Sequence, residues 1–226
     1  MKKSMIIVAG GSGTRMGAAM PKQFIELNGK PILMHTLENL HEMDGTMQLI
    51  LVLPKNQFPF WYELKEKHRF NLKHELAEGG ETRFLSVKNG MARVLDADLI
   101  GVHDGVRPFP SVDLVNACFR SAELNGAAIP TMPIVQSLRR ITNAHREAVD
   151  RNDYVAVQTP QCFRAQILRK AFGQADRTDY SDDATVVESA GHRIHLVEGT
   201  PENIKITTPF DLELAQLIIA RRTDSN

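Results

Sequence analysis

Three short apolar runs limit the fold of this 226-residue chain more than any other feature of its sequence. They are residues 5–9 (MIIVA), 49–53 (LILVL) and 99–103 (LIGVH). The apolar residues in each run are nearly continuous rather than alternating, which is typical of strands buried on both faces of a parallel sheet. We therefore expect these runs to be the central strands of such a sheet.

Segments with a helical spacing of buried residue types separate these runs. Three segments each place four residues on one helical face: Leu33, Thr36, Leu37 and Leu40; Phe84, Val87, Met91 and Val94; and Val115, Cys118, Phe119 and Ala122. The alternation of strand and helix indicates the α/β class, with a mostly parallel twisted sheet and helices on both of its faces.

Another helix is expected near the C-terminus. Thr208 is suited to its N-cap, Pro209 to its first position and Asp211 to its first turn. The apolar face of this helix is expected to continue through Leu214, Leu217 and Ile218.

The charge balance and the cysteines exclude several classes of protein. Lys and Arg total 27 and Asp and Glu total 27, so no excess positive field is present to hold a nucleic acid polymer. Cys118 and Cys162 lie in no metal-binding or redox spacing, which predicts neither a zinc site nor a disulfide scaffold. No apolar stretch approaches a membrane span. We expect a cytoplasmic protein in which residues 1–226 form one domain.

A glycine-rich loop, residues 10–17 (GGSGTRMG), follows the first apolar run directly. Glycines allow backbone N–H groups to approach an anion closely. The loop lacks the Gly-Lys-Ser/Thr of a Walker A motif, and Met16 stands where a dinucleotide fingerprint has its third glycine. With Arg15 in the loop and Lys22 just after it, the pattern predicts a cradle for a triphosphate. A glycine-rich turn without a ligand is the alternative.

Residues 129–161 break the α/β pattern. They contain three prolines and two strand-like pieces, 137–141 and 148–150, on either side of the polar turn 142–145. We expect a β-hairpin arm at about 130–156 that leaves the main sheet. Because an isolated two-stranded arm is marginally stable, we expect it to pack on a second subunit in a homodimer.

Seven sequence segments also carry a family resemblance: AGGSGTRMG, PKQF, GGETRFLSV, HDGVRPF, VDRND, TPQCF and NIKITTPFDL. In this order they resemble the 2-C-methyl-D-erythritol 4-phosphate cytidylyltransferases, and the resemblance covers nearly the whole chain. It implies a Rossmann-like nucleotidyltransferase fold and a homodimer with interlocking arms. It also implies CTP and Mg²⁺ as requirements, with CDP-methylerythritol and pyrophosphate as products.

The resemblance assigns roles to particular residues. Arg15 and Lys22 match the pair that stabilises the transition state, and residues 79–83, with Ser86 nearby, match the segment that contacts the cytosine. The nucleotide contacts expected in this way are Ala9, Gly10, Gly11, Ser12, Gly13, Thr14, Gly79, Gly80, Arg83, Ser86 and Asp104. A plain tight turn and helix cap is the alternative interpretation of residues 79–83.

Asp104 ends the third apolar run, at the edge of the sheet where α/β proteins bind ligands. It is a candidate for holding Mg²⁺ or the ribose. We count the nearby Arg107 among the substrate contacts, with a structural ion pair to Asp104 as the alternative. His103 is more often a structural hydrogen-bonding residue than a ligand.

Two further cations are expected at the acceptor. By resemblance, Arg151 and Lys205 hold the methylerythritol phosphate and join Arg15 and Lys22 as catalytic residues. Arg151 follows the hairpin, so it can belong to the site of the neighbouring subunit; a surface salt bridge is the alternative. Ser137 and Arg139 stand where the family commonly has Asp-Thr-x-Lys, and we expect them to contact the polyol.

Two other functions remain open at this point. One is a cytidylyltransferase for another alditol phosphate, such as ribitol 5-phosphate, although the VDRN segment favours the methylerythritol phosphate enzyme. The other is a non-catalytic nucleotide-binding regulator. The presence of Arg15, Lys22 and Asp104 argues against it, since sensing a nucleotide requires no neutralised leaving group.

Overall fold

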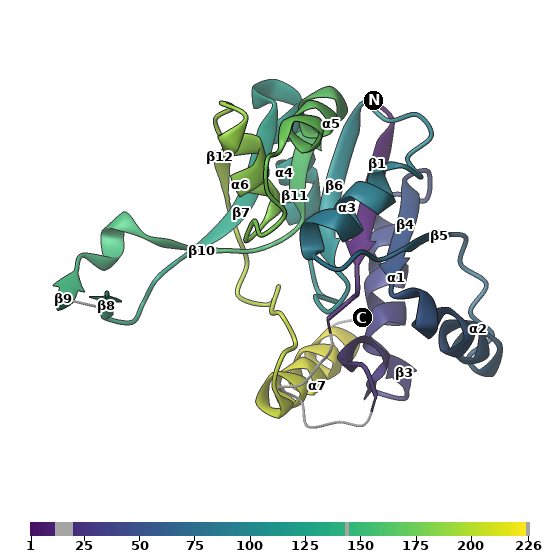
Figure 1. The fold of residues 1–226 in the computed structure, drawn as a ribbon. Helices are drawn as coiled ribbons and strands as arrows, with labels where there is room; N and C mark the ends of the chain where they lie inside the picture. The colour runs from purple at the N-terminus through teal and green to yellow at the C-terminus, as the bar shows by residue number, and fades with distance from the viewer. Residues whose placement is uncertain (12–19, 143–144, 225–226) are drawn as a thin grey trace.

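The computed structural model describes residues 1–11, 20–142 and 145–224, and its centre is a twisted sheet (Figure 1). Within these residues the sheet has eight strands in the order β10-β7-β11-β6-β1-β4-β5, with β12 beside β7. The strands are β1 (Lys3–Val8), β4 (Gln48–Leu53), β5 (Glu75–Glu78), β6 (Leu99–Asp104), β7 (Ala127–Pro133), β10 (Val155–Val157), β11 (Gln161–Arg164) and β12 (His195–Glu198). A short pair, β2 (Glu26–Leu27) and β3 (Lys30–Pro31), lies outside the sheet.

The three apolar runs are adjacent parallel strands, as predicted. Ile6 of β1 is paired with Ile50 of β4 on one side and Val102 of β6 on the other. The β4–β5 and β7–β12 pairs are also parallel, while β11 and β10 are antiparallel to their neighbours. All three of the predicted strands are almost completely buried because both of their faces are covered by helices.

Helices pack on both faces of the sheet (Figure 1). The helices in the described ranges are α1 (Ile32–Met43), α2 (Phe58–Lys67), α3 (Arg83–Met91), α4 (Val112–Asn125), α5 (Ala165–Gln174), α6 (Asp183–Ser189) and α7 (Pro209–Asp224), and the 3₁₀ turns are η2 (Lys22–Phe24), η3 (Lys55–Gln57) and η4 (Arg151–Asp153). One core cluster joins β1 and β4 to α1, α2 and α4 through side chains such as Met5, Leu37 and Trp61. A second cluster joins the opposite face to α3, α5 and α6. None of the helices in the described ranges is long and apolar enough to cross a membrane.

The C-terminal helix begins where the sequence predicts. The backbone N–H of Asp211 donates to Oγ1 of Thr208 over 3.2 Å, and the N–H of Thr208 donates to the Asp211 carboxylate over 2.8 Å. The predicted apolar face is wrong in part, because the side chain of Leu217 is 62% exposed. The helix packs on a small third cluster mainly through Ala215 and Ile218, so its buried stripe is narrower than the apolar pattern indicates.

The predicted hairpin is present, but it is shorter than expected. Strands β8 (Leu138–Ile141) and β9 (Arg146–Val149) pair antiparallel and stand away from the body of the molecule (Figure 1). The predicted limits of about 130–156 are wrong, because residues 127–133 and 155–157 belong to the main sheet as β7 and β10. Prolines are uncommon inside sheets. Pro130 and Pro133 therefore led to the prediction that β7 is part of the arm.

Candidate functional site

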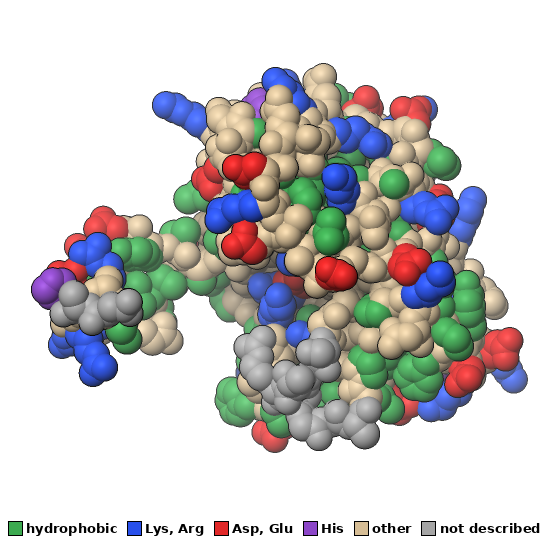
Figure 2. Space-filling model, in the orientation of Figure 1, with side chains coloured by type: hydrophobic (Ala, Val, Ile, Leu, Met, Phe, Trp, Pro, Cys, Tyr) green, Lys and Arg blue, Asp and Glu red, His purple; other side chains and the backbone are tan. Residues whose placement is uncertain are grey.

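A cavity opens at the edge of the sheet where β1 and β6 end. Its lining comes from segments distant in the sequence: Val8, Ala9, Gly10, Gly11, Lys22, Gln23, Gly80, Glu81, Thr82, Arg83, Ser86, Asp104, Val106 and Lys205. Figure 2 shows Lys and Arg side chains near the hollow at the centre of this face. The structure thus brings together nine of the predicted residues, namely Ala9, Gly10, Gly11, Lys22, Gly80, Arg83, Ser86, Asp104 and Lys205. The predicted Ser12, Gly13, Thr14 and Arg15 lie outside the described residues.

Lys22 lies directly against the start of the glycine-rich loop. A Cβ atom on Gly11 would lie 3.2 Å from Cε of Lys22 and 3.6 Å from its Nζ. Glycine at this position therefore allows the ammonium group to approach the loop backbone.

The turn that carries Lys22 is anchored to the protein core. The buried Gln23 donates from Nε2 to Oε1 of Gln57 over 2.7 Å, and Phe24 stacks against Trp61 with 6.3 Å between the ring centroids. Because the other two residues of η2, Gln23 and Phe24, are buried, the backbone of Lys22 is held at a fixed place beside the cavity.

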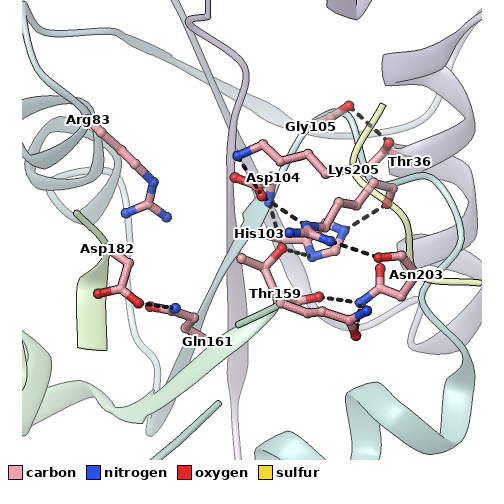
Figure 3. A network of polar contacts seen from close by, with 12 residues as sticks. Thr36, Arg83, His103, Asp104, Gly105, Thr159, Gln161, Asp182, Asn203 and Lys205 are labelled. Atoms are coloured by element: carbon pink, nitrogen blue, oxygen red, sulfur yellow. Dashed lines mark hydrogen bonds and ion pairs between the residues drawn. The ribbon is translucent and has the colours of Figure 1, made fainter. Parts of the chain in front are cut away.

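Asp104, at the end of β6, is the centre of a charge cluster. Its Oδ2 lies 3.1 Å from Nζ of Lys205 and 3.0 Å from Nε of Arg107 (Figure 3). The Arg107 guanidinium also donates to the carbonyl of Asn203 over 2.8 Å. Arg107 is thus the structural ion-pair partner that the sequence left as an alternative, and it is buried behind Asp104. Lys205 is 41% exposed at its side chain and reaches the cavity.

A buried hydrogen-bond network holds Asp104 from behind (Figure 3). The backbone N–H of Asp104 donates to Oγ1 of Thr159 over 3.1 Å, and that hydroxyl lies 3.0 Å from Nδ1 of His103. Nε2 of His103 lies 2.9 Å from the carbonyl of Arg107. Since a carbonyl only accepts, Nε2 carries the proton and Nδ1 accepts from the threonine. His103 is therefore structural, as the sequence indicated.

The surroundings of this network set the charge states of its members. Burial lowers the pKa of His103 to about 4, so the imidazole is neutral near pH 7. Burial alone would raise the pKa of Asp104, but the charges of Lys205 and Arg107 hold it well below its usual range. The cavity therefore presents a permanent carboxylate with a cation beside it.

Residues 80–83 and Ser86 form the opposite wall of the cavity. A Cβ atom on Gly80 would lie 2.3 Å from Cβ of Leu85, so only glycine fits there. The N–H of Gly80 donates to Oγ of Ser86 over 3.0 Å, and Oγ1 of Thr82 accepts from the N–H of Leu85 as the N-cap of α3. Glycine at position 80 and the Ser86 hydroxyl thus fix the path of this backbone beside the ligand space.

Arg83 lies in the first turn of α3 and pairs with Asp183, whose Oδ2 is 2.6 Å from the guanidinium. Asp183 lies at the start of α6. Gln161 of β11 supports the same helix start, because its Oε1 accepts from the backbone N–H groups of Asp183 and Ala184 over 3.1 and 2.9 Å. Sequence reasoning did not assign a role to Gln161, although it lies in the segment TPQCF.

Some predicted site residues lie far from the cavity of their own chain. Ser137, Arg139 and Arg151 are on the arm, and Arg151 donates to the carbonyl of Val135 over 2.6 Å. Gly79 lies behind the cavity wall, where its N–H donates to the carbonyl of Leu53. Residues 203–207, which include Lys205, form neither a helix nor a strand, and the backbone N–H of Ile206 donates to the carbonyl of Val106 over 2.9 Å.

The described residues include no cluster of three or more His, Cys, Asp or Glu side chains able to hold a metal ion. Asp104 and Glu81 are the acids that line the ligand space among the described residues, and the two cations beside Asp104 approach the same oxygen, Oδ2. A magnesium ion is commonly held by one or two carboxylates together with substrate phosphates rather than by a full protein cage. The site therefore fits a metal ion that arrives with a phosphorylated ligand.

The chain is similar to known proteins over nearly its whole length. Residues 4–221 match the family model described as 2-C-methyl-D-erythritol 4-phosphate cytidylyltransferase. A protein of that name from Bacteroides thetaiotaomicron is 51% identical over 219 residues, which are 97% of this chain and 100% of the relative.

Two solved structures share the fold. The cytidylyltransferase from Thermus thermophilus is 32% identical, with a TM-score of 0.79 over 96% of this chain and 98% of that one. The 4-diphosphocytidyl-2C-methyl-D-erythritol synthase from Anaerococcus prevotii is 26% identical, with a TM-score of 0.82 over 97% and 98%.

Proposed function

Since the chain belongs to the 2-C-methyl-D-erythritol 4-phosphate cytidylyltransferase family, we propose how its residues carry out that reaction. The enzyme transfers the CMP moiety of CTP to 2-C-methyl-D-erythritol 4-phosphate and releases pyrophosphate. An oxygen of the acceptor phosphate forms a bond to the α-phosphorus, and the bond from that phosphorus to the bridging oxygen of pyrophosphate breaks. The observation that carries the proposal is the placement of Lys22, Arg83, Asp104 and Lys205 around one cavity at the end of β6.

The reaction requires positioned charge more than proton transfer. A phosphomonoester has a second pKa near 6, so the acceptor is already an anionic nucleophile at neutral pH. The main barriers are the repulsion between two anions and the charge that builds on the departing pyrophosphate. Fixed cations lower both barriers, and the cavity has them on opposite walls.

Lys22 and Lys205 take different parts in this scheme. Lys22, held against Gly11 at the loop, contacts the triphosphate and stabilises the leaving pyrophosphate, together with Arg15. Lys205, held by Asp104, receives the acceptor phosphate beside the α-phosphate. Asp104 keeps the Lys205 ammonium directed at the cavity, which leaves less motion to be lost when the acceptor binds.

We also propose that the nucleotide binds with Mg²⁺ at Asp104. Asp104 would hold the ion, which would supply additional positive charge to stabilise the triphosphate. The base lies against residues 79–86, where Gly80 and Ser86 form the cavity wall.

A homodimer completes the acceptor site in this proposal. The arm carries exposed apolar side chains, among them Val135 (70% exposed) and Ile141 (73%). A lone hairpin with such a surface gains stability by packing on another chain. The arm of a second subunit would bring its own Ser137, Arg139 and Arg151 to the cavity.

One assay tests the function against both alternatives. Pyrophosphate release from CTP is measured with methylerythritol phosphate and with ribitol 5-phosphate in turn. We expect release with the first acceptor. Release with ribitol 5-phosphate alone would indicate the second cytidylyltransferase activity, and release with neither acceptor would indicate a regulator. Relatives that share 51% identity and carry the methylerythritol phosphate name do not favour either alternative.

A further inference from the structure

Two adjacent acids at the start of α6 have different structural tasks. Asp182 is the N-cap of the helix, because its Oδ1 accepts from the backbone N–H of Thr185 over 3.0 Å. Its Oδ2 accepts from Nε2 of Gln161 over 2.8 Å. Helix capping is thus provided by Asp182, and the carboxylate of Asp183 is not needed for it.

The carboxylate of Asp183 is instead buried at the back of the cavity wall. The residue is 1% exposed, and its Oδ2 accepts from the Arg83 guanidinium over 2.6 Å. Its Oδ1 is buried with no hydrogen-bond partner among the described residues. A buried charged oxygen without a partner is costly. Stability of α6 therefore does not explain an acid at this position.

Arg83 connects Asp183 to the ligand space. It lines the cavity beside Gly80 and Ser86, whereas Asp183 does not. A second carboxylate, Asp104, also attracts the Arg83 guanidinium electrostatically from within the cavity. Asp104 holds Lys205 at 3.1 Å, so a guanidinium that moved onto Asp104 would disturb that pair.

We propose that Asp183 is a positioning residue for the nucleotide: its ion pair with Arg83 holds the guanidinium at the cavity wall, directed toward bound CTP, and keeps it from collapsing onto Asp104. This inference rests on the proposed function, because the ligand it positions for is CTP. It also predicts that the effect of Asp183 on CTP depends entirely on Arg83.

The test compares Asp183→Asn with a matched control, Asp182→Asn. The control removes the neighbouring charge but keeps a good N-cap, since asparagine caps helices as well as aspartate does. CTP binding is measured by calorimetry with Mg²⁺ present and without acceptor, and the KM for CTP and kcat are measured with the acceptor.

We expect Asp183→Asn to weaken CTP binding and raise its KM by about tenfold or more, as when an orienting partner of a ligand-binding group is lost. We expect kcat to change less than the KM does. We expect Asp182→Asn to stay within about twofold of the wild type in CTP binding. Wild-type CTP affinity in Asp183→Asn, or an equal loss in both variants, would overturn the proposal.

Arg83→Gln and the double variant Arg83→Gln/Asp183→Asn complete a double-mutant cycle for CTP binding. Arg83→Gln also tests the proposal if Asp183→Asn does not fold. If Asp183 acts through Arg83, the double variant binds CTP as Arg83→Gln does, both more weakly than the wild type. Additive losses, or normal CTP binding by Arg83→Gln, would overturn the idea. Wild-type protein that binds CTP but releases no pyrophosphate contradicts the proposed function alone. Wild-type protein that does not bind CTP contradicts both.

Discussion

Nζ of Lys205 lies 3.1 Å from Oδ2 of Asp104, although the two residues come from opposite halves of the chain. The pair places a cation beside a carboxylate at the end of β6, with the lysine 41% exposed to the cavity and the aspartate 11% exposed. The lysine is thus held in place and still accessible to a ligand.

Lys205→Ala is expected to lower kcat/KM for the acceptor by about a hundredfold or more, the scale of a lost fixed charge at a reacting phosphate. Lys170→Ala, which removes an exposed lysine of α5, is the control and should leave the rate unchanged. Steady-state kinetics with the acceptor varied at saturating CTP provide the measurement. A small effect that equals the control would exclude Lys205 from the acceptor site.

Lys22→Ala is expected to lower kcat by at least about a hundredfold, because a preorganised charge on the leaving pyrophosphate is lost. The fold should remain intact, since Gln23 and Phe24 anchor the turn from the core side. Fluorescence of the sole tryptophan, Trp61, which stacks on Phe24, reports whether the turn is preserved. Near-normal turnover in a correctly folded variant would contradict the assignment of Lys22.

Mixing two inactive variants tests whether Arg151 serves the partner's site. In a mixed dimer with one Lys205→Ala subunit and one Arg151→Ala subunit, one of the two cavities keeps its own Lys205 and receives an intact Arg151 from the partner. Random exchange should therefore restore about a quarter of the wild-type rate, because half of the dimers are mixed and each has one complete site. No recovery after subunits have exchanged would show that Arg151 does not act in the partner's cavity.

The buried His103 should make the protein less stable in acid. Its pKa is about 4 in the folded protein and 6.5 when unfolded, so the unfolded chain takes up the proton first. The stabilisation is present above the unfolded pKa and is lost as the pH falls from 6.5 toward 4. This group should lower the free energy of unfolding by about 2 kcal/mol between about pH 7 and about pH 5.

Urea unfolding of the wild type and His103→Gln at both pH values isolates this contribution. The variant is expected to be less stable at neutral pH, because two buried hydrogen bonds change, but its loss on acidification should be smaller. Other buried groups, such as His74 and Asp183, titrate in both proteins and cancel in the difference. Equal losses in the two proteins would contradict the neutral state of His103.

Gly80→Ala should destabilise the protein by about 1–3 kcal/mol, since the added Cβ would lie 2.3 Å from Cβ of Leu85. The KM for CTP should rise as well, because Gly80 lines the cavity. Gly173→Ala is the matched control: nothing lies within 4 Å of its Cβ, and alanine in α5 should stabilise by about 0.5–1 kcal/mol. Thermal unfolding of both variants measures the contrast, and a stable, fully active Gly80→Ala protein would refute it.

The sequence by itself determined the central strands, most of the helix faces and the hairpin. These features depend on local periodicity: continuous apolar runs such as residues 99–103 form strands covered on both faces, and the 3.6-residue spacing gives a helix one buried side. Periodicity failed where burial depended on what packs nearby, as at Leu217, which is exposed although it fits the apolar pattern of α7. It failed again at β7, because the prolines of this strand led to the prediction that it belongs to the arm and not to the main sheet.

The tertiary structure decided which charges pair. Motifs predicted Lys22, Arg83, Asp104 and Lys205 as site residues, but they did not predict that Asp104 pairs with both Lys205 and Arg107. The motifs also did not predict the pairing of Arg83 with Asp183. An ion pair depends on the distance between two side chains in space, and the sheet sets that distance by bringing the ends of separate strands and helices to one edge.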